Sequence, residues 1–319
     1  MIVVTGGAGF VGSSLIWALN CRNRSNILIV DHLGESEKWR NLVPLSYIDY
    51  IDKNSFLDAM SSDALPDNIT SVIHLGACTD PLEKNHSYLV ESNFKFSQAL
   101  ASYCLNKHIR FIYASSATTY GKGQASLSDS EEKIESLRPS TSLAYSKQMF
   151  DMWAYKNKIL DRISGLKFSH VFGPNEYHRI ESPSLITRNF RSIEKGDRIY
   201  SAKNEDSDFV IDPIYIKDAV EILLFLMDNP ELNGLYNAGT GTSFSLSQIS
   251  KLCLRACGKE EDLTDPAIEL PNHYKILPAG LNMERIKKAG FRHNYRSLER
   301  ALSDYYLNYF NKQVRFGEE

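Results

Sequence analysis

Short runs of aliphatic and β-branched residues alternate with longer segments in which apolar residues recur at helical spacing through the first half of the chain. Runs of the first kind predict buried strands, and segments of the second kind predict helices that pack against them. The predicted strands are residues 2–5, 27–30, 46–49, 71–76, 110–114 and 163–171, the last interrupted by Gly165. The predicted helices start near residue 10 and cover residues 55–64, 86–106 and 142–158. This alternation indicates a doubly wound parallel sheet with helices on both faces.

The second half of the chain predicts a smaller lobe. Helices are expected at residues 185–193, 219–227, 245–256, 282–289 and 297–310, with a short strand at 214–216 and a returning strand at 234–237. Because the chain leaves the sheet and returns to it, we expect two interleaved units. The larger unit comprises residues 1–172 and 210–240, and the α/β lobe comprises residues 173–209 and 241–319.

Three glycines at fixed spacing join the first predicted strand to the first helix. Gly6 permits a tight turn, Gly9 lets the backbone approach a pyrophosphate, and Gly12 lets the helix pack closely on the strand. The start of the helix, at Phe10 and Val11, then directs its N–H groups at the anion. The sequence therefore predicts a Rossmann-type dinucleotide site at the N-terminus, with the C-terminal lobe supplying the substrate site.

Composition narrows the class of protein. The chain has 319 residues, 43% of them hydrophobic, which suffices for a substantial core. The net charge of −3 comes from interspersed charges, so neither nucleic acid nor a membrane is an expected partner. No apolar run approaches the ~20 residues of a membrane span, and the five cysteines lack paired spacing, which predicts a cytoplasmic protein. Cys253 and Cys257 share a predicted helix with core residues, so we expect packing there and no metal site.

Small and hydroxyl-bearing residues follow two of the predicted strands. Ser116 lies at the carboxyl end of the strand 110–114, where open α/β sheets bind ligands, and it is placed to hold a substrate hydroxyl. Gly76, Ala77 and Cys78 follow the strand 71–76, so we expect them beside the dinucleotide.

Several strings of residues together resemble one family. They are Gly6-x-x-Gly9-x-x-Gly12, Gly76-Ala77, Ser115-Ser116-Ala117-Thr118, Tyr145-Ser146-Lys147, Gly173-Pro174-Asn175-Glu176-Tyr177-His178 and Asn237-Ala238-Gly239-Thr240-Gly241. With them, the chain resembles the extended short-chain dehydrogenase/reductases that act on nucleotide sugars, and among these most the ADP-L-glycero-D-manno-heptose 6-epimerases, nearly end to end. The resemblance implies a nucleotide-activated, ADP-heptose-like sugar as substrate and a closed homo-oligomer.

The resemblance also implies a mechanism. In that family, bound NADP removes a hydride from the sugar carbon that bears the hydroxyl and returns it to the other face, without net oxidation. Lys147 would contact the nicotinamide ribose and lower the pKa of a tyrosine four residues earlier, which exchanges the hydroxyl proton. That position holds Leu143 here, and a leucine carries no proton. Tyr145 is the nearest phenol, but two residues from Lys147 it projects roughly 200° around the helix.

Three further positions depart from the family's pattern. Phe168-Ser169-His170 replaces Tyr-Phe-Asn, and Ile211-Asp212-Pro213-Ile214-Tyr215 lacks an arginine that would bind diphosphate. Arg179 replaces a lysine that is the candidate second acid/base; because arginine stays protonated, we expect it to bind an anionic part of the substrate. His170 and His178 are candidate substrate contacts; structural hydrogen bonding is the favoured role for both, and replacement of the missing proton carrier is the alternative.

Charged residues after the second strand bear on the cofactor. Asp31, with His32 beside it, is placed to hold a ribose 2′-hydroxyl, which favours NAD. Lys38 and Lys53 match positions that reach the 2′-phosphate of NADP in the family, so NADP is favoured and NAD is the alternative; otherwise both are ordinary solvated lysines. The resemblance places Asn93 where it orders the loops beneath the cofactor.

Two functions are consistent with these residues. The first is an epimerase that retains Ser116 and Lys147 and uses altered proton transfer. The second is a catalytically inactive relative that keeps the dinucleotide as a structural ligand and acts as a scaffold or partner subunit. Leu143 is the residue that separates them, because the fold and the cofactor site serve both.

Overall fold

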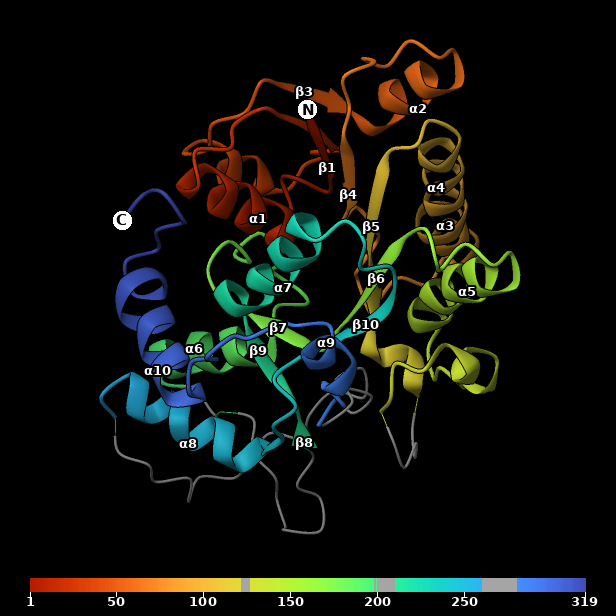
Figure 1. Cartoon of the computed structure of the whole chain (residues 1–319). Helices are drawn as coiled ribbons and strands as arrows, with labels where there is room; N and C mark the ends of the chain where they lie inside the picture. The colour runs from red at the N-terminus through yellow and green to blue at the C-terminus, as the bar shows by residue number, and fades with distance from the viewer. Residues whose placement is uncertain (122–126, 198, 200–209, 260–279) are drawn as a thin grey trace.

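The sheet at the centre of the molecule is parallel throughout. In the computed structural model, which describes residues 1–121, 127–197, 199, 210–259 and 280–319, the strands lie in the order β10-β6-β5-β4-β1-β2-β3 (Figure 1). They are β1 (Ile2–Thr5), β2 (Ile27–Asp31), β3 (Asp49–Asp52), β4 (Ser71–His74), β5 (Arg110–Ser116), β6 (Ser164–Phe168) and β10 (Gly234–Ala238). Every neighbouring pair is parallel, which confirms the predicted doubly wound sheet.

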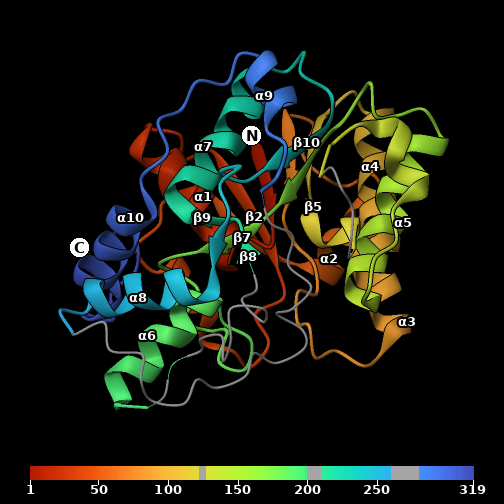
Figure 2. The same cartoon turned by 90° about the horizontal axis from the view of Figure 1, so that it is seen from below.

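Helices cover both faces of this sheet (Figure 2). One face carries α1 (Phe10–Cys21) and α7 (Ile216–Asp228); the other carries α2 (Lys53–Ser61), α4 (Phe96–Asn106) and α5 (Ser142–Lys156). Alternate residues of β1 serve the two cores, because Val4 packs on the α1 side while Val3 packs with Phe56 and Phe150 on the other. A strand buried on both faces therefore appears in the sequence as a continuous apolar run.

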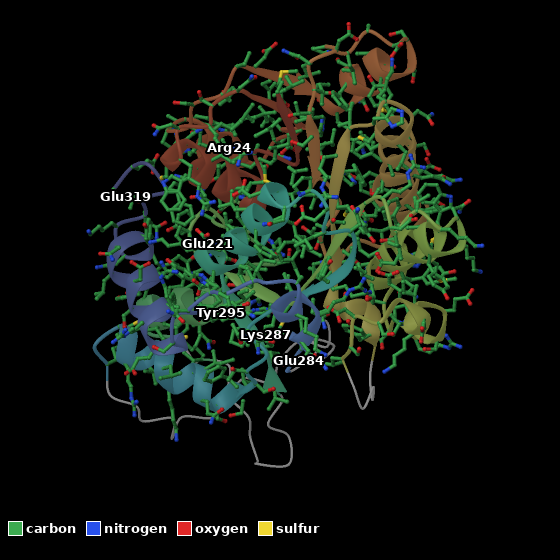
Figure 3. All side chains as sticks on the ribbon, in the orientation of Figure 1. Arg24, Glu221, Glu284, Lys287, Tyr295 and Glu319 are labelled. Carbon is green, nitrogen blue, oxygen red and sulfur yellow. The ribbon has the colours of Figure 1, made fainter. Side chains whose placement is uncertain are left out.

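Helix α7 ties the second half of the chain to the first. It packs against α1, and two ion pairs flank the contact: Arg22 Nη2 lies 2.7 Å from Glu221 Oε2, and Arg24 Nη1 lies 2.9 Å from Asp228 Oδ1. Figure 3 labels Arg24 and Glu221 on the two sides of this contact. Since exposed pairs contribute at most ~1 kcal/mol each, apolar packing supplies most of the attachment.

The remaining elements form a smaller region beside the sheet (Figure 1). Its paired strands are β7 (His170–Phe172) with β9 (Pro213–Tyr215), and β8 (Val210–Ile211) with β11 (Phe244–Ser245). Its helices are α6 (Leu185–Lys195), α8 (Leu246–Ala256), α9 (Glu284–Lys288), α10 (Leu298–Asp304) and a π-helical turn, Tyr305–Phe310. Cys253 is buried in α8, as expected of a core residue. Within the described residues, no helix has the length and apolar character needed to cross a bilayer.

Three predicted strand features were wrong in detail. The third strand is Asp49–Asp52 rather than 46–49, because this edge strand is only partly buried and its apolar pattern is weak. The predicted strand 163–171 is two strands, since the chain leaves the main sheet at Ser169 and β7 pairs with β9. Gly165 does not interrupt β6; a Cβ there would lie 2.4 Å from Tyr113 Cζ, so the glycine makes room for that ring.

Candidate functional site

In the glycine loop after β1, backbone segments approach one another so closely that Gly6 and Gly12 have no room for a side chain. Gly6 has φ +69°, and a Cβ on it would lie 2.6 Å from the Gly76 nitrogen. A Cβ on Gly12 would lie 2.1 Å from the Gly6 carbonyl oxygen, and Gly9 N–H donates to the same oxygen at 3.0 Å. The backbone of the loop and the N-terminus of α1 are therefore open to an anion, and these residues fit the pyrophosphate of a dinucleotide.

A cavity of about 190 Å³ lies next to this loop, at the carboxyl ends of β1, β2 and β4. We call it the Asp31 cavity. Eight residues expected at the cofactor line it: Gly6, Asp31, His32, Lys38, Lys53, Gly76, Ala77 and Cys78. Residues from four separate segments of the sequence, which end or follow β1, β2, β3 and β4, thus meet in one hollow, because parallel strands end at the same edge of the sheet.

The carboxylate of Asp31 organises one wall of the Asp31 cavity. Its Oδ2 accepts the Ala8 N–H at 2.9 Å, and its Oδ1 accepts the His32 N–H and the Lys38 ammonium, each at 2.7 Å. Lys38 is therefore held at the cavity rather than free in solvent. Lys53 lies half-buried with Nζ 4.7 Å from the centre of the Phe96 ring, and burial lowers its pKa. Neither lysine is an ordinary solvated side chain.

Asn93 connects the floor of the Asp31 cavity to α5. Its side-chain oxygen accepts the Cys78 N–H at 2.8 Å, and its amide nitrogen donates to the Cys78 carbonyl at 3.0 Å and to Ser146 Oγ at 2.9 Å. Asn93 sits in a π-helical segment, Val90–Lys95, between α3 (His86–Leu89) and α4. Such turns are frequent at functional sites. The predicted single helix 86–106 contains this turn, which periodicity does not reveal.

A second cavity, of about 280 Å³, opens where β5 and β6 end and the smaller region begins. We call it the Ser116 cavity. Seven residues selected from the sequence line it: Phe10, Val11, Ser116, Leu143, Lys147, His170 and Arg179. Thr118 and Thr141 also line it and were not selected, although Thr141 directly precedes a predicted helix and acts as its N-cap by accepting the Ala144 N–H.

Ser116 and Lys147 contribute polar groups to the wall of the Ser116 cavity. Ser116 Oγ lies 2.8 Å from Thr118 Oγ1 and accepts the Thr118 N–H at 3.2 Å. Lys147 Nζ donates to the Ala114 carbonyl at 2.9 Å. Burial lowers the pKa of Lys147 to about 8, partly offset by the Asp151 carboxylate. The amine therefore exchanges its proton near neutral pH, unlike an ordinary lysine.

The position one helical turn before Lys147 contributes only hydrocarbon. Leu143 lines the Ser116 cavity, whereas Tyr145 is 53% exposed and lines a separate hollow with Arg138. Tyr145 thus points away from Lys147, as its spacing predicts. Among the described residues that line the Ser116 cavity, none supplies a phenol.

The two histidines contact other segments of the chain, as expected of structural hydrogen-bonding residues. His170 lines the Ser116 cavity, but its Nε2 accepts the Leu185 N–H at 3.2 Å at the start of α6, and burial lowers its pKa to about 3. It satisfies an orphan helix donor and stays neutral, which agrees with the structural interpretation and not with proton transfer. His178 is not among the residues that line this cavity; its Nδ1 lies 3.5 Å from Asn41 Nδ2, and burial lowers its pKa to about 4.

Arg179 lines the Ser116 cavity together with Lys147. Within the part of the chain that the structure describes, its guanidinium has no hydrogen bond or ion pair. An unpaired guanidinium at a cavity wall is suited to an anionic group, which is the role expected from the sequence.

A buried ion pair behind the Ser116 cavity escaped the sequence analysis. Lys167 Nζ lies 2.8 Å from Asp151 Oδ2, and both side chains are almost fully enclosed. Asp151 also accepts from Tyr113 Oη at 3.0 Å and from Ser115 Oγ at 2.7 Å. The sequence could have indicated this pair, because Lys167 lies inside a predicted buried strand and a buried charge requires a partner of opposite charge.

Known proteins similar to this chain share its full length. ADP-L-glycero-D-manno-heptose-6-epimerase of Nitratidesulfovibrio vulgaris (strain DP4) is 36% identical over 316 residues, which cover 97% of this chain and 98% of that protein. The protein of the same name from Fusobacterium nucleatum subsp. nucleatum is 34% identical and covers 98% and 99%.

Solved structures of similar shape support the fold. ADP-L-glycero-D-manno-heptose-6-epimerase of Helicobacter pylori has a TM-score of 0.81 at 21% identity, covering 96% of this chain and 95% of that one. UDP-glucose 4-epimerase of Thermotoga maritima, solved with UDP-glucose, has a TM-score of 0.78 at 20% identity, covering 98% and 99%. Residues 2–239 match the NAD dependent epimerase/dehydratase family. With this match and relatives above one-third identity over nearly its whole length, the chain belongs to the NAD dependent epimerase/dehydratase family.

Proposed function

We propose that the protein is an NADP-dependent nucleotide-sugar epimerase of the ADP-heptose 6-epimerase type, with proton transfer altered from that of its relatives. The observation that carries this proposal is the Ser116 cavity, which has both Ser116 and Lys147 in its wall and starts where α1 leaves the glycine loop. Full-length similarity to ADP-L-glycero-D-manno-heptose-6-epimerases supports the sugar type.

Different residues of the chain would bind different parts of the dinucleotide. Gly6, Gly9 and Gly12 would hold the pyrophosphate, and Lys38 and Lys53 the 2′-phosphate. When bound, the cofactor supplies reversible hydride transfer at the sugar carbon.

The substrate contacts lie in the other cavity. Ser116 would hold the reacting hydroxyl, and Arg179 an anionic part of the sugar nucleotide. Leu75, Phe168 and the other apolar residues of the Ser116 cavity exclude water from the carbonyl that forms transiently.

A second candidate rests on Leu143. Because it replaces a proton carrier with hydrocarbon at the cavity wall, the same fold and cofactor site would also serve a catalytically inactive scaffold or partner subunit. A cytoplasmic location and a closed homo-oligomer are part of the proposal under either candidate.

Purified protein distinguishes the candidates. Denaturing the protein should release NADP, which mass spectrometry identifies. NMR should show interconversion of the C6 epimers of ADP-heptose. Release of a dinucleotide without any epimer interconversion would favour the inactive candidate. Release of NAD instead of NADP would overturn only the choice of cofactor.

The choice of cofactor is tested at Lys38. We expect Lys38→Ala to weaken NADP binding roughly 10-fold and to change NAD binding little, because it removes one cation from a phosphate that NAD lacks; charge-assisted hydrogen bonds are worth about 1.5–3 kcal/mol. Isothermal titration calorimetry with both dinucleotides measures this. Lys251→Ala, an exposed lysine on α8, is the matched control. Equal losses for NADP and NAD would contradict a 2′-phosphate contact.

A further inference from the structure

The Ser116 cavity offers few groups that can exchange a proton. Among the described residues that line it, only Lys147, His170 and Arg179 have ionisable side chains. Interconverting an alcohol and a carbonyl requires one group that both takes and returns the hydroxyl proton. Within the described part of the chain, these three are therefore the candidate carriers.

Two of the three are excluded by their chemistry or contacts. Arg179 stays protonated at any working pH, so it cannot accept a proton. His170 uses Nε2 to accept the Leu185 N–H, which commits the ring to one tautomer and ties it to the start of α6. Protonating that nitrogen would break the bond and leave the helix donor unpaired.

Unlike Arg179 and His170, Lys147 can accept a proton without losing a hydrogen bond. Among the described residues its one hydrogen bond goes to the Ala114 carbonyl, two residues before Ser116 on the same strand, so a neutral amine keeps that bond and has its lone pair free. The nearest carboxylate on its own helix, Asp151, already accepts from Tyr113, Ser115 and Lys167 and makes no ion pair with Lys147 among the described residues. Nothing in the cavity wall locks the amine as an ammonium.

We propose that the Lys147 amine is itself the acid/base of this protein, taking the hydroxyl proton of a substrate held at Ser116 and returning it, in place of the phenol that Leu143 lacks. This rests on the proposed function. In the first half-reaction the substrate O–H and C–H bonds break and a C=O bond forms; the proton goes to Nζ and the hydride leaves to the oxidised dinucleotide. The second half-reaction reverses both transfers on the other face, so atoms and electrons balance. Burial of Lys147, which lowers its pKa, keeps the neutral amine accessible near neutral pH.

The first test follows the amine without turnover. Acetylation of Lys147 in the free protein, quantified by mass spectrometry against pH, should reach half its maximal rate near pH 8, whereas exposed Lys251 should titrate near its ordinary value of about 10.4. A Lys147 midpoint as high as that of Lys251 would overturn the proposal.

The second test follows the reaction. Lys147→Arg keeps a cation but cannot accept a proton, so turnover of ADP-heptose should fall by roughly 10²–10⁴-fold while NADP binding, measured by calorimetry, changes little. In Lys147→Ala, added ethylamine should restore turnover in proportion to the concentration of its free base. Native turnover should rise with pH and level off above about pH 8.

The outcomes separate the two proposals. Native turnover that persists in Lys147→Arg, or an unrescued Lys147→Ala that still binds NADP, would overturn the role of Lys147 and leave the epimerase standing. A native protein that binds NADP and epimerises no ADP-heptose would overturn the proposed function and the role of Lys147 together.

Discussion

Replacing Leu143 with tyrosine is expected to increase epimerisation of ADP-heptose by up to roughly 10²-fold, the low end of the usual contribution of a positioned acid/base, because Lys147 already exchanges the proton in the native protein. Residues 143 and 147 are separated by one turn of α5, and both line the Ser116 cavity. A phenol at 143 would therefore stand beside the Lys147 amine, whose positive charge would favour the phenolate. NMR of the C6 epimer ratio against time measures the gain.

Leu143→Phe is the matched control for this change. It adds the same ring to the same cavity without a hydroxyl, so it reproduces any effect of packing and none of proton transfer. Similar turnover in the Tyr and Phe variants would show that the added ring changes the shape of the cavity and that its hydroxyl adds no proton transfer to that of Lys147. A loss of activity in both would indicate that the cavity needs the volume that Leu143 leaves open.

The second large effect is expected at the ion pair behind the cavity. Lys167→Met should lower the free energy of unfolding by about 3–5 kcal/mol, because it leaves the Asp151 carboxylate buried with only the Tyr113 and Ser115 hydroxyls as donors. Urea denaturation followed by circular dichroism measures the loss.

A double-mutant cycle controls for packing at this pair. Lys167→Met combined with Asp151→Asn removes the stranded charge, so the double variant should be more stable than Lys167→Met alone. Losses that simply add would show that the two charges are not coupled, and that the cost of Lys167→Met comes from the lost hydrogen bond to Thr119 Oγ1 and the lost cation–π contact with Tyr120.

Much of the fold was predictable because its strands are buried on both faces. Val3 and Val4 supply opposite cores, so β1 appears as an unbroken apolar run. The half-exposed β3 has a weaker pattern, and the prediction slipped by three residues. Gly165 appeared to break a strand because the ring it accommodates, Tyr113, comes from a neighbouring strand 52 residues earlier in the sequence.

The positions of candidate site residues were predictable where those residues lie at the ends of strands. Asp31 and Ser116 end strands, Gly76 follows one, and the parallel strands bring all three to one edge of the sheet. The partners of side chains were not predictable in this way. A structural role was favoured for His170, but its partner, the Leu185 N–H, belongs to a helix end that only the folded chain brings near. Lys167 and Asp151 were passed over for the same reason, as their pairing joins a strand to a helix.

Asn93 has a consequence for any attempt to redesign the chemistry. One amide side chain holds the backbone of Cys78, in the cofactor cavity, and the hydroxyl of Ser146, which directly precedes Lys147. A substitution on α5 that shifts the helix will therefore also displace the floor of the Asp31 cavity. We expect variants of α5 that change the rate of the reaction to change the affinity for a dinucleotide as well.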